Sequence, residues 1–235
     1  MQALAIIMFD PMYFVIVGPA ILLAMWAQWK VKSAYDEAGR RPARSGLSGA
    51  EAAQRILDIH GIRDVAIEPV KSFLGDHYDS RNRVLRLSPD VYHGRSLASL
   101  GIAAHEVGHA IQDATRYAPL ALRNGLVPMA SAGSGLSMIL VMAGLFIASL
   151  RPLAIVGLLL FATVVLFQLV NLPVEFNASR RARAILLTNG LITQAEDHTV
   201  AKVLNAAAMT YVAATVMAML QLLYFAMLVF GGRRN

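Results

Sequence analysis

Two histidines and a glutamate stand close together in the sequence, at His105, Glu106 and His109. They form the pattern H-E-x-x-H inside an apolar, alanine-rich stretch without proline. On a helix, residues four apart share one face, so both imidazoles project together and suit a zinc ion. Glu106 is one residue along, where it can take a proton from a water on the metal. The pattern predicts a hydrolytic zinc centre; a chance match on a core helix is the alternative.

A hydrolytic zinc usually has three protein ligands and an open position for water. The compact pattern H-E-x-x-H-x-x-G-x-x-H is excluded, because Gln112 stands in the place of its glycine and Thr115 in the place of its last histidine. Glu175 is the best candidate, since its apolar neighbours would make an unpartnered carboxylate costly. Its alternatives are a helix N-terminal acid or a pair with Arg180 or Arg181. The other candidates for the third ligand are His60, His77, His93 and His198.

Further candidate catalytic groups lie in the stretch D-H-Y-D, which contains His77 and Tyr78. His77 is the second choice for the metal, and either residue can donate a hydrogen bond to the oxyanion that forms in hydrolysis. A solvated turn is the alternative. Asp113, one turn beyond the second histidine, is placed to orient an imidazole. Other candidate donors to the oxyanion are Tyr211 and Arg180.

The composition indicates a membrane protein. Of 235 residues, 57% are hydrophobic and 15% are charged, whereas a soluble domain has about 25% charged residues. Four stretches without Asp, Glu, Lys or Arg are each long enough to cross a bilayer. We predict four transmembrane helices within residues 11–29, 124–150, 152–174 and 203–232.

The distribution of charge predicts the topology. Residues 30–123 carry 14 Lys and Arg and residues 180–202 carry four, whereas three lie elsewhere. The positive-inside rule therefore places the H-E-x-x-H stretch and Glu175 in the cytoplasm and both termini outside. The net charge of +6 does not indicate a nucleic-acid partner, because the basic residues flank the spans. The absence of cysteine excludes disulfides and thiolate ligands, and the lack of charge within the spans argues against a transporter.

Between the first two spans, the sequence predicts a small α+β region. Residues 30–46 are charged and have the composition of a flexible linker, and a capping box of Ser48 and Glu51 then begins a helix that stops near Gly61. Strand-like runs at 65–67, 72–74 and 84–87, with a turn at 79–82, predict a short antiparallel sheet. An edge strand of that sheet can hold an extended peptide over the metal, unless the sheet merely covers the helix.

Cap signals place the remaining helices. Ser88-Pro89-Asp90 predicts a short helix, and Ser96 begins the H-E-x-x-H helix, which runs to about Ala114. The third span ends near Val170, and a capping box of Thr193 and Glu196 begins a helix that leads into the fourth. The expected divisions are a first transmembrane helix (1–30), a cytoplasmic zincin-like domain (31–125), transmembrane helices 2 and 3 (126–174), cytoplasmic helices with the third ligand (175–202) and transmembrane helix 4 (203–235).

Several motifs along the chain resemble those of a known family. H-E-V-G-H followed much later by V-E-F-N-A-S-R-R-A, together with L-S-P-D-V-Y-H-G-R-S and A-A-A-M-T-Y-V-A-A, is similar to the YugP-like membrane zinc metallopeptidases. More distantly it resembles HtpX-type and CAAX-prenyl-protease-type gluzincins, which have a later E-x-x-A-D. Glu175 and Ala178 match that motif, but Ser179 replaces its aspartate. Hydrogen bonding by Asn177 or Ser179 must then replace that carboxylate.

The resemblance implies a mainly α membrane protein of the bacterial plasma membrane that acts as a zinc metalloendopeptidase. The expected ligands are His105, His109 and Glu175, with Glu106 as the base. Expected partners are membrane lipid and protein or peptide substrates, such as membrane proteins or unfolded segments, and the oligomeric state stays open. The alternative function is a non-catalytic membrane scaffold with a structural zinc, which requires a closed site with four protein ligands.

Overall fold

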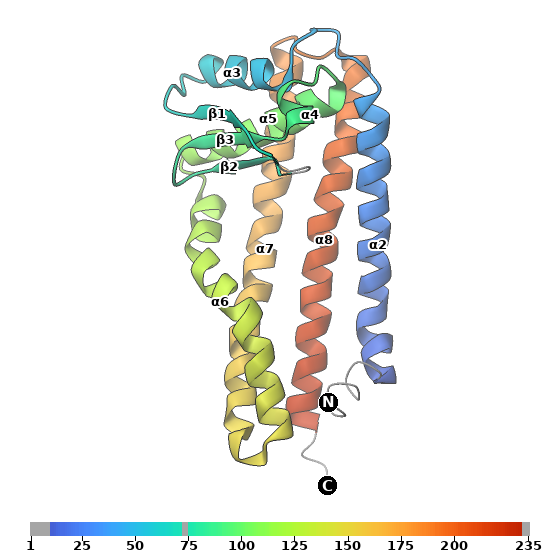
Figure 1. Cartoon of the computed structure of the whole chain (residues 1–235), viewed down its shortest axis with the longest axis vertical. Helices are drawn as coiled ribbons and strands as arrows, with labels where there is room; N and C mark the ends of the chain where they lie inside the picture. Colours follow the sequence, from blue (N-terminus) through green and yellow to red (C-terminus); the bar gives the residue numbers. More distant parts are fainter. Residues whose placement is uncertain (1–9, 72–74, 232–235) are drawn as a thin grey trace. The chain divides into compact units, whose positions relative to one another are not determined.

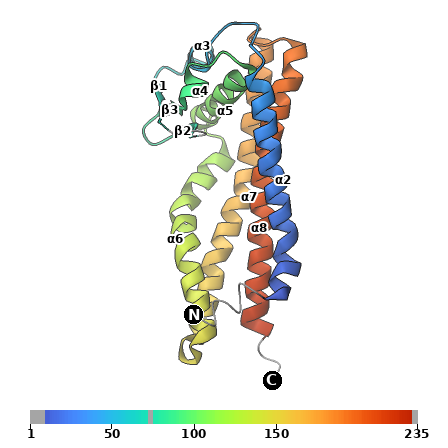
Figure 2. The same cartoon turned by 45° about the vertical axis from the view of Figure 1, so that its right-hand side comes forward.

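The structure is a computed structural model that describes residues 10–71 and 75–231. It is mainly helical (Figures 1 and 2). The chain divides into two compact units. Unit 1 takes its described residues from Met1–Ala27, Leu122–Leu172 and Thr210–Asn235, and unit 2 takes its residues from Gln28–Ala121 and Pro173–Met209.

Among the described residues, four helices are long and apolar enough to cross a membrane, which agrees with the four predicted spans. Many of their apolar side chains point outward; Val15, for example, is 71% exposed. Such exposure would be unfavourable in water and is expected where lipid surrounds the helix. These helices are α2 (Pro11–Gly39), α6 (Ala118–Phe146), α7 (Arg151–Thr188) and α8 (Gln194–Gly231).

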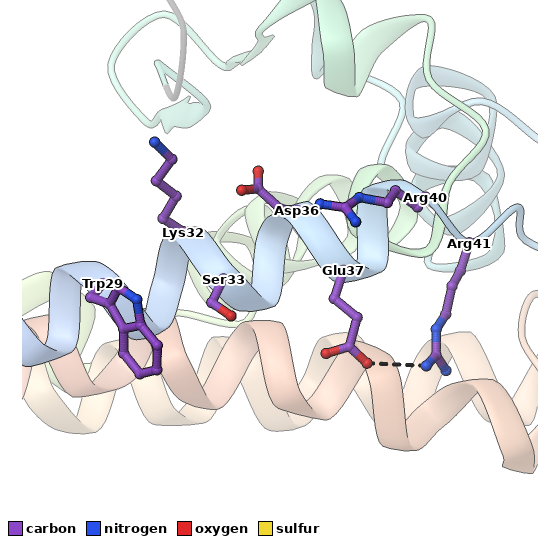
Figure 3. A pocket seen from close by; sticks show the side chains of 7 residues that line it. All are labelled: Trp29, Lys32, Ser33, Asp36, Glu37, Arg40 and Arg41. Carbon is purple, nitrogen blue, oxygen red and sulfur yellow. Dashed lines mark hydrogen bonds and ion pairs between the residues drawn. The ribbon is translucent and has the colours of Figure 1, made fainter.

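The charged end of α2 corrects the prediction of a flexible linker over residues 30–46. The helix continues to Gly39 because Ala34 and Ala38 recur on one face and are buried in the core of unit 2. A cavity of about 660 Å³ lies along another part of this segment, where Glu37 pairs with Arg41 at 3.0 Å (Figure 3). After the helix, the N–H of Ala43 donates to the carbonyl of Arg95 at 2.9 Å, so the connecting segment is an ordered part of unit 2.

Helix α7 runs without interruption through Pro173, so the predicted end of the third span near Val170 is not the end of a helix. A proline removes one backbone hydrogen bond but leaves the rest of the ladder intact. Pro173 is also the residue at which this helix passes into unit 2.

The small sheet is mixed, which corrects the predicted antiparallel arrangement. Strand β1 (Ala66–Pro69) pairs parallel with β3 (Val84–Leu87), and β2 (His77–Asp79) pairs antiparallel with β3, in the order β1-β3-β2. The connection from β1 to β3 is long enough to return the chain to the same end of the sheet, which parallel pairing requires. The predicted strand at 72–74 lies outside the described residues.

Helix α5 (Leu97–Ala114) is the centre of unit 2. Ser96 caps it, as predicted, and α3 (Gly49–Ile59) and α4 (Pro89–Tyr92) pack beside it (Figure 2). Both predicted capping boxes are present, at Ser48 with Glu51 and at Thr193 with Glu196. Most of α5 is buried, which fixes the orientation of the polar groups that it carries.

Candidate metal centre

The two histidines of the H-E-x-x-H pattern lie one turn apart on the same face of α5. Their rings are 4.8 Å apart between centroids and nearly perpendicular, at 85°. His109 is buried and His105 is partly buried. Helix periodicity alone accounts for this pairing, because the stretch stays helical throughout.

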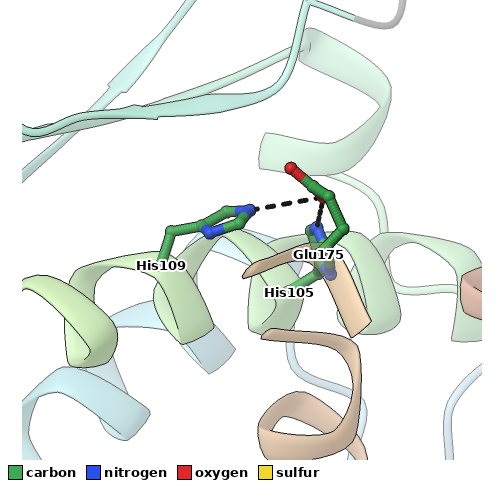
Figure 4. A group of neighbouring side chains, drawn as sticks. All are labelled: His105, His109 and Glu175. Atoms are coloured by element: carbon green, nitrogen blue, oxygen red, sulfur yellow. Dashed lines mark ion pairs between the residues drawn. The ribbon is translucent and has the colours of Figure 1, made fainter. Parts of the chain in front are cut away.

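Glu175 reaches the same point from α7 (Figure 4). Its Oε2 atom lies 3.3 Å from Nε2 of His105 and 3.7 Å from Nε2 of His109. Two ligand atoms about 2.0 Å from a tetrahedral zinc are about 3.3 Å apart. The separations therefore leave a suitable space for a metal ion.

The approach of α7 to α5 depends on a glycine. A Cβ atom at Gly108 would lie 2.9 Å from the carbonyl oxygen of Ala178, closer than real Cβ atoms come. The missing side chain lets the two backbones nearly touch. Because Ala178 is three residues after Glu175 on the same helix, this contact brings the carboxylate within reach of the histidines.

The hydrogen bonds around the cluster fit a cation. Oε2 of Glu175 is buried and, apart from the Nε2 atoms of the two histidines, has no polar partner among the described residues. A buried carboxylate oxygen without a donor is costly unless a positive charge balances it. Two imidazoles and a carboxylate are also a common donor set for catalytic zinc. The residues present thus fit the metal.

The Nδ1 atom of each imidazole lies close to a neutral polar side chain. The Ser179 hydroxyl lies 3.1 Å from Nδ1 of His105, and Oε1 of Gln112 lies 3.0 Å from Nδ1 of His109. Ser179 therefore takes the place of the aspartate that the related motif contains. Asp113 does not orient an imidazole as expected, because it accepts a hydrogen bond from the Tyr78 hydroxyl at 2.9 Å.

Glu106 is 9% exposed and lies beside strand β2. Its Oε2 accepts a hydrogen bond from the backbone N–H of Tyr78 at 3.1 Å. Backbone groups alternate in direction along an antiparallel strand, so this N–H faces away from β3. The carboxylate is thus held next to the free edge of the sheet.

Two of the four predicted oxyanion donors, His77 and Tyr78, lie on β2. Burial and then the bond to Asp113 raise the pKa of the Tyr78 phenol, which keeps it protonated and directed to that carboxylate. His77 is exposed, with Nδ1 2.8 Å from the carbonyl oxygen of Gly75, and is outside the metal cluster. Arg180 is exposed on α7, and Tyr211 belongs to unit 1.

The remaining histidine candidates do not join the cluster. His60 and His93 are the C-terminal caps of α3 and α4, and His198 is exposed near the start of α8. Among the described residues the cluster holds three ligand groups, namely His105, His109 and Glu175.

The electrostatics of the cluster favour positive charge. Burial lowers the pKa of the His109 imidazole, but the carboxylates of Glu175 and Glu106 outweigh it, and the net pKa is raised. A bound cation would supply the positive charge that these two carboxylates favour.

Known proteins are similar to this chain. A family described as "putative neutral zinc metallopeptidase" matches residues 13–230. The chain belongs to this family. It is also 47% identical, over 91% of its own length and 95% of the relative's, to the "putative membrane protease YugP" of Bacillus subtilis (strain 168). No solved structure matches the chain.

Membership of this zinc metallopeptidase family implies zinc, and the three converging side chains offer it a place. The resemblance seen in the sequence is confirmed at the level of the family. Sequence reasoning missed Gln112, although it is three residues beyond His109 and hence on the same helix face. The signal that could have identified it was an amide side chain three residues after a proposed ligand, on a helix expected to be buried.

Proposed function

We propose that the chain is a zinc-dependent metalloendopeptidase that hydrolyses peptide bonds of protein substrates at the membrane–cytoplasm boundary. The observation that carries the proposal is the buried cluster of His105, His109 and Glu175 with Glu106 beside it. When bound, zinc supplies a Lewis acid that acidifies water and polarises the scissile carbonyl.

In this mechanism His105, His109 and Glu175 hold the metal. Glu106 accepts a proton from the attacking water and passes it to the leaving amine. The hydrogen bond from the Tyr78 N–H orients the Glu106 carboxylate. His77, Tyr78 and Arg180 remain the candidate donors to the oxyanion.

The position of β2 supports a peptide substrate. It is an edge strand of the sheet, and the N–H of Tyr78 already points out of the sheet toward Glu106. An extended peptide that pairs with this edge would bring its backbone next to the base.

The cellular setting rests on sequence features. Glu175 follows the charge-free stretch 152–174 directly, and the basic residues gather in the same segments as the proposed ligands. Under the positive-inside rule these segments lie in the cytoplasm and both termini lie outside. Plausible substrates are membrane proteins and their flexible cytosolic segments.

The alternative of a structural zinc scaffold has less support. A closed structural site would need a fourth protein ligand, whereas the cluster among the described residues holds three. Such a site would also have no use for the buried carboxylate of Glu106.

The decisive experiment compares purified wild type with Glu106→Gln in the cleavage of an unstructured protein. Loss of the base should reduce the rate by about 10²- to 10⁴-fold while zinc stays bound. Chelation should abolish wild-type cleavage, and added zinc should restore it. Glu68→Gln, an exposed glutamate on β1, is the matched control. Equal, chelator-insensitive cleavage by wild type and Glu106→Gln would refute the proposal.

The ligand set is tested by metal content, measured by mass spectrometry. Glu175→Ala and His109→Ala should both lose zinc under conditions in which the wild type retains it. Full retention by Glu175→Ala would show that the third ligand is another residue.

A further inference from the structure

We propose that Gln112, held in turn by Asn177 and Arg181, is a positioning residue that presents Nε2 of His109 to the metal. This inference rests on the proposed zinc site and concerns the residues behind it.

Gln112 is a fully buried amide, with 0% of its surface exposed. Its Nε2 donates to the carbonyl oxygen of Val174 at 2.8 Å and to Oδ1 of Asn177 at 3.0 Å. Its Oε1 lies 3.0 Å from Nδ1 of His109. A buried amide with both donor hydrogens used is held in one orientation.

The direction of these hydrogen bonds follows from Arg181. A guanidinium has only donors, and its Nε lies 2.7 Å from Oδ1 of Asn177. That atom must therefore be the amide oxygen, which then accepts from Gln112 Nε2. The oxygen of Gln112 is left to face His109, so Nδ1 of His109 carries the proton.

This tautomer matters for the metal. A neutral imidazole with a proton on Nδ1 has its lone pair on Nε2. Nε2 is the atom that lies 3.7 Å from Oε2 of Glu175. The hydrogen-bond chain thus leaves the lone pair of His109 pointing at the place where the ligands converge.

Gln112 also fixes the second half of the cluster. Val174, whose carbonyl accepts from its amide, immediately precedes Glu175. One side chain on α5 therefore holds both a histidine ligand and the backbone beside the carboxylate. His105 has a weaker arrangement, because the Ser179 hydroxyl can either donate or accept and does not select a tautomer.

The test measures zinc affinity by chelator competition on the purified full-length protein, without reference to peptidase activity. Gln112→Met keeps the size of the side chain but removes its hydrogen bonds, and should weaken zinc binding about 10- to 100-fold. Gln54→Met, the same change at an exposed position of α3, should leave the affinity unchanged.

A pair of changes at Asn177 separates positioning from packing. Asn177→Asp keeps an oxygen that accepts from Gln112 and Arg181, and should bind zinc within about threefold of wild type. Asn177→Leu removes the acceptor and should weaken binding at least about tenfold. In the zinc-loaded wild type, imidazole ¹⁵N shifts should show the Nδ1–H form of His109, and in Asn177→Leu a second form should appear. This pair decides the question if Gln112→Met does not fold.

Wild-type affinity in both Gln112→Met and Asn177→Leu would overturn the inference. So would equal losses in Asn177→Asp and Asn177→Leu. In either case a loss of zinc by His109→Ala would leave the proposed metal site standing. Equal zinc binding by wild type and His109→Ala would instead refute the site itself.

Discussion

The contact between Gly108 and Ala178 makes the proposed metal site sensitive to one methyl group. We expect Gly108→Ala to weaken zinc binding without touching any ligand. The added Cβ would lie 2.9 Å from the carbonyl oxygen and 3.2 Å from the Cα of Ala178, both backbone atoms. A backbone cannot rotate away as a side chain can, so α5 and α7 must separate.

The size of the effect follows from the distances. Ordinary contacts of a Cβ atom begin near 3.4 Å, so α7 must move by about 0.5 Å. Overpacking of this kind costs about 1–3 kcal/mol. A metal site tolerates ligand shifts of only about 0.2 Å. We therefore expect zinc affinity to fall at least about tenfold, which lowers the stabilisation by saturating zinc by about 1.4 kcal/mol.

The assay is chelator competition for zinc together with thermal unfolding, with and without zinc. Gly39→Ala is the matched control, because a Cβ at that position has no neighbour within 4 Å. A Gly108→Ala protein that binds zinc as tightly as the wild type would refute the reasoning. A loss of affinity as large in Gly39→Ala would do the same.

Two further predictions concern groups near the site. Because the pKa of Tyr78 is raised in the folded protein, folding favours its protonated phenol; this stabilisation is complete below about pH 10 and falls as the pH rises above it. Urea unfolding at pH 8 and pH 10.5 should therefore show a smaller loss for Tyr78→Phe than for wild type, and equal losses would contradict the assignment. Arg183 donates to the buried Asp197 at 2.9 and 2.6 Å, so Arg183→Met should destabilise unit 2 by about 3 kcal/mol. The exposed neighbour Arg180→Met should change stability by less than about 0.5 kcal/mol in the same denaturant titration, and similar losses in both would show that the pair contributes little.

Local rules were enough to find the proposed ligands. The i, i+4 spacing of His105 and His109 needs only a continuous helix, and Glu175 stood out as a carboxylate with apolar neighbours. The capping boxes could also be predicted, because each depends on two residues three positions apart. The lengths of the charge-free stretches likewise indicated four spans.

Features that depend on residues far apart in the sequence could not be predicted. The parallel pairing of β1 depends on how the chain returns to β3, and a short apolar run carries no sign of strand direction. The role of Gln112 depends on Val174 and Asn177, which are 62 and 65 residues away. The helical conformation of the charged end of α2 could not be predicted, because its charged residues are typical of a linker. Ala34 and Ala38, which lie on its buried face, are small residues and give only a weak periodic signal.

The separation between His109 and Glu175 also has a consequence for biosynthesis. The ribosome makes the carboxylate 66 residues after the second imidazole, and the intervening chain includes the whole of α6. At typical rates of translation this takes about 3 to 13 seconds. A nascent or truncated chain that lacks Glu175 carries Glu106 and both imidazoles but an incomplete donor set. A hydrolase built from these residues would stay inactive until α6 and the apolar part of α7 had been synthesised.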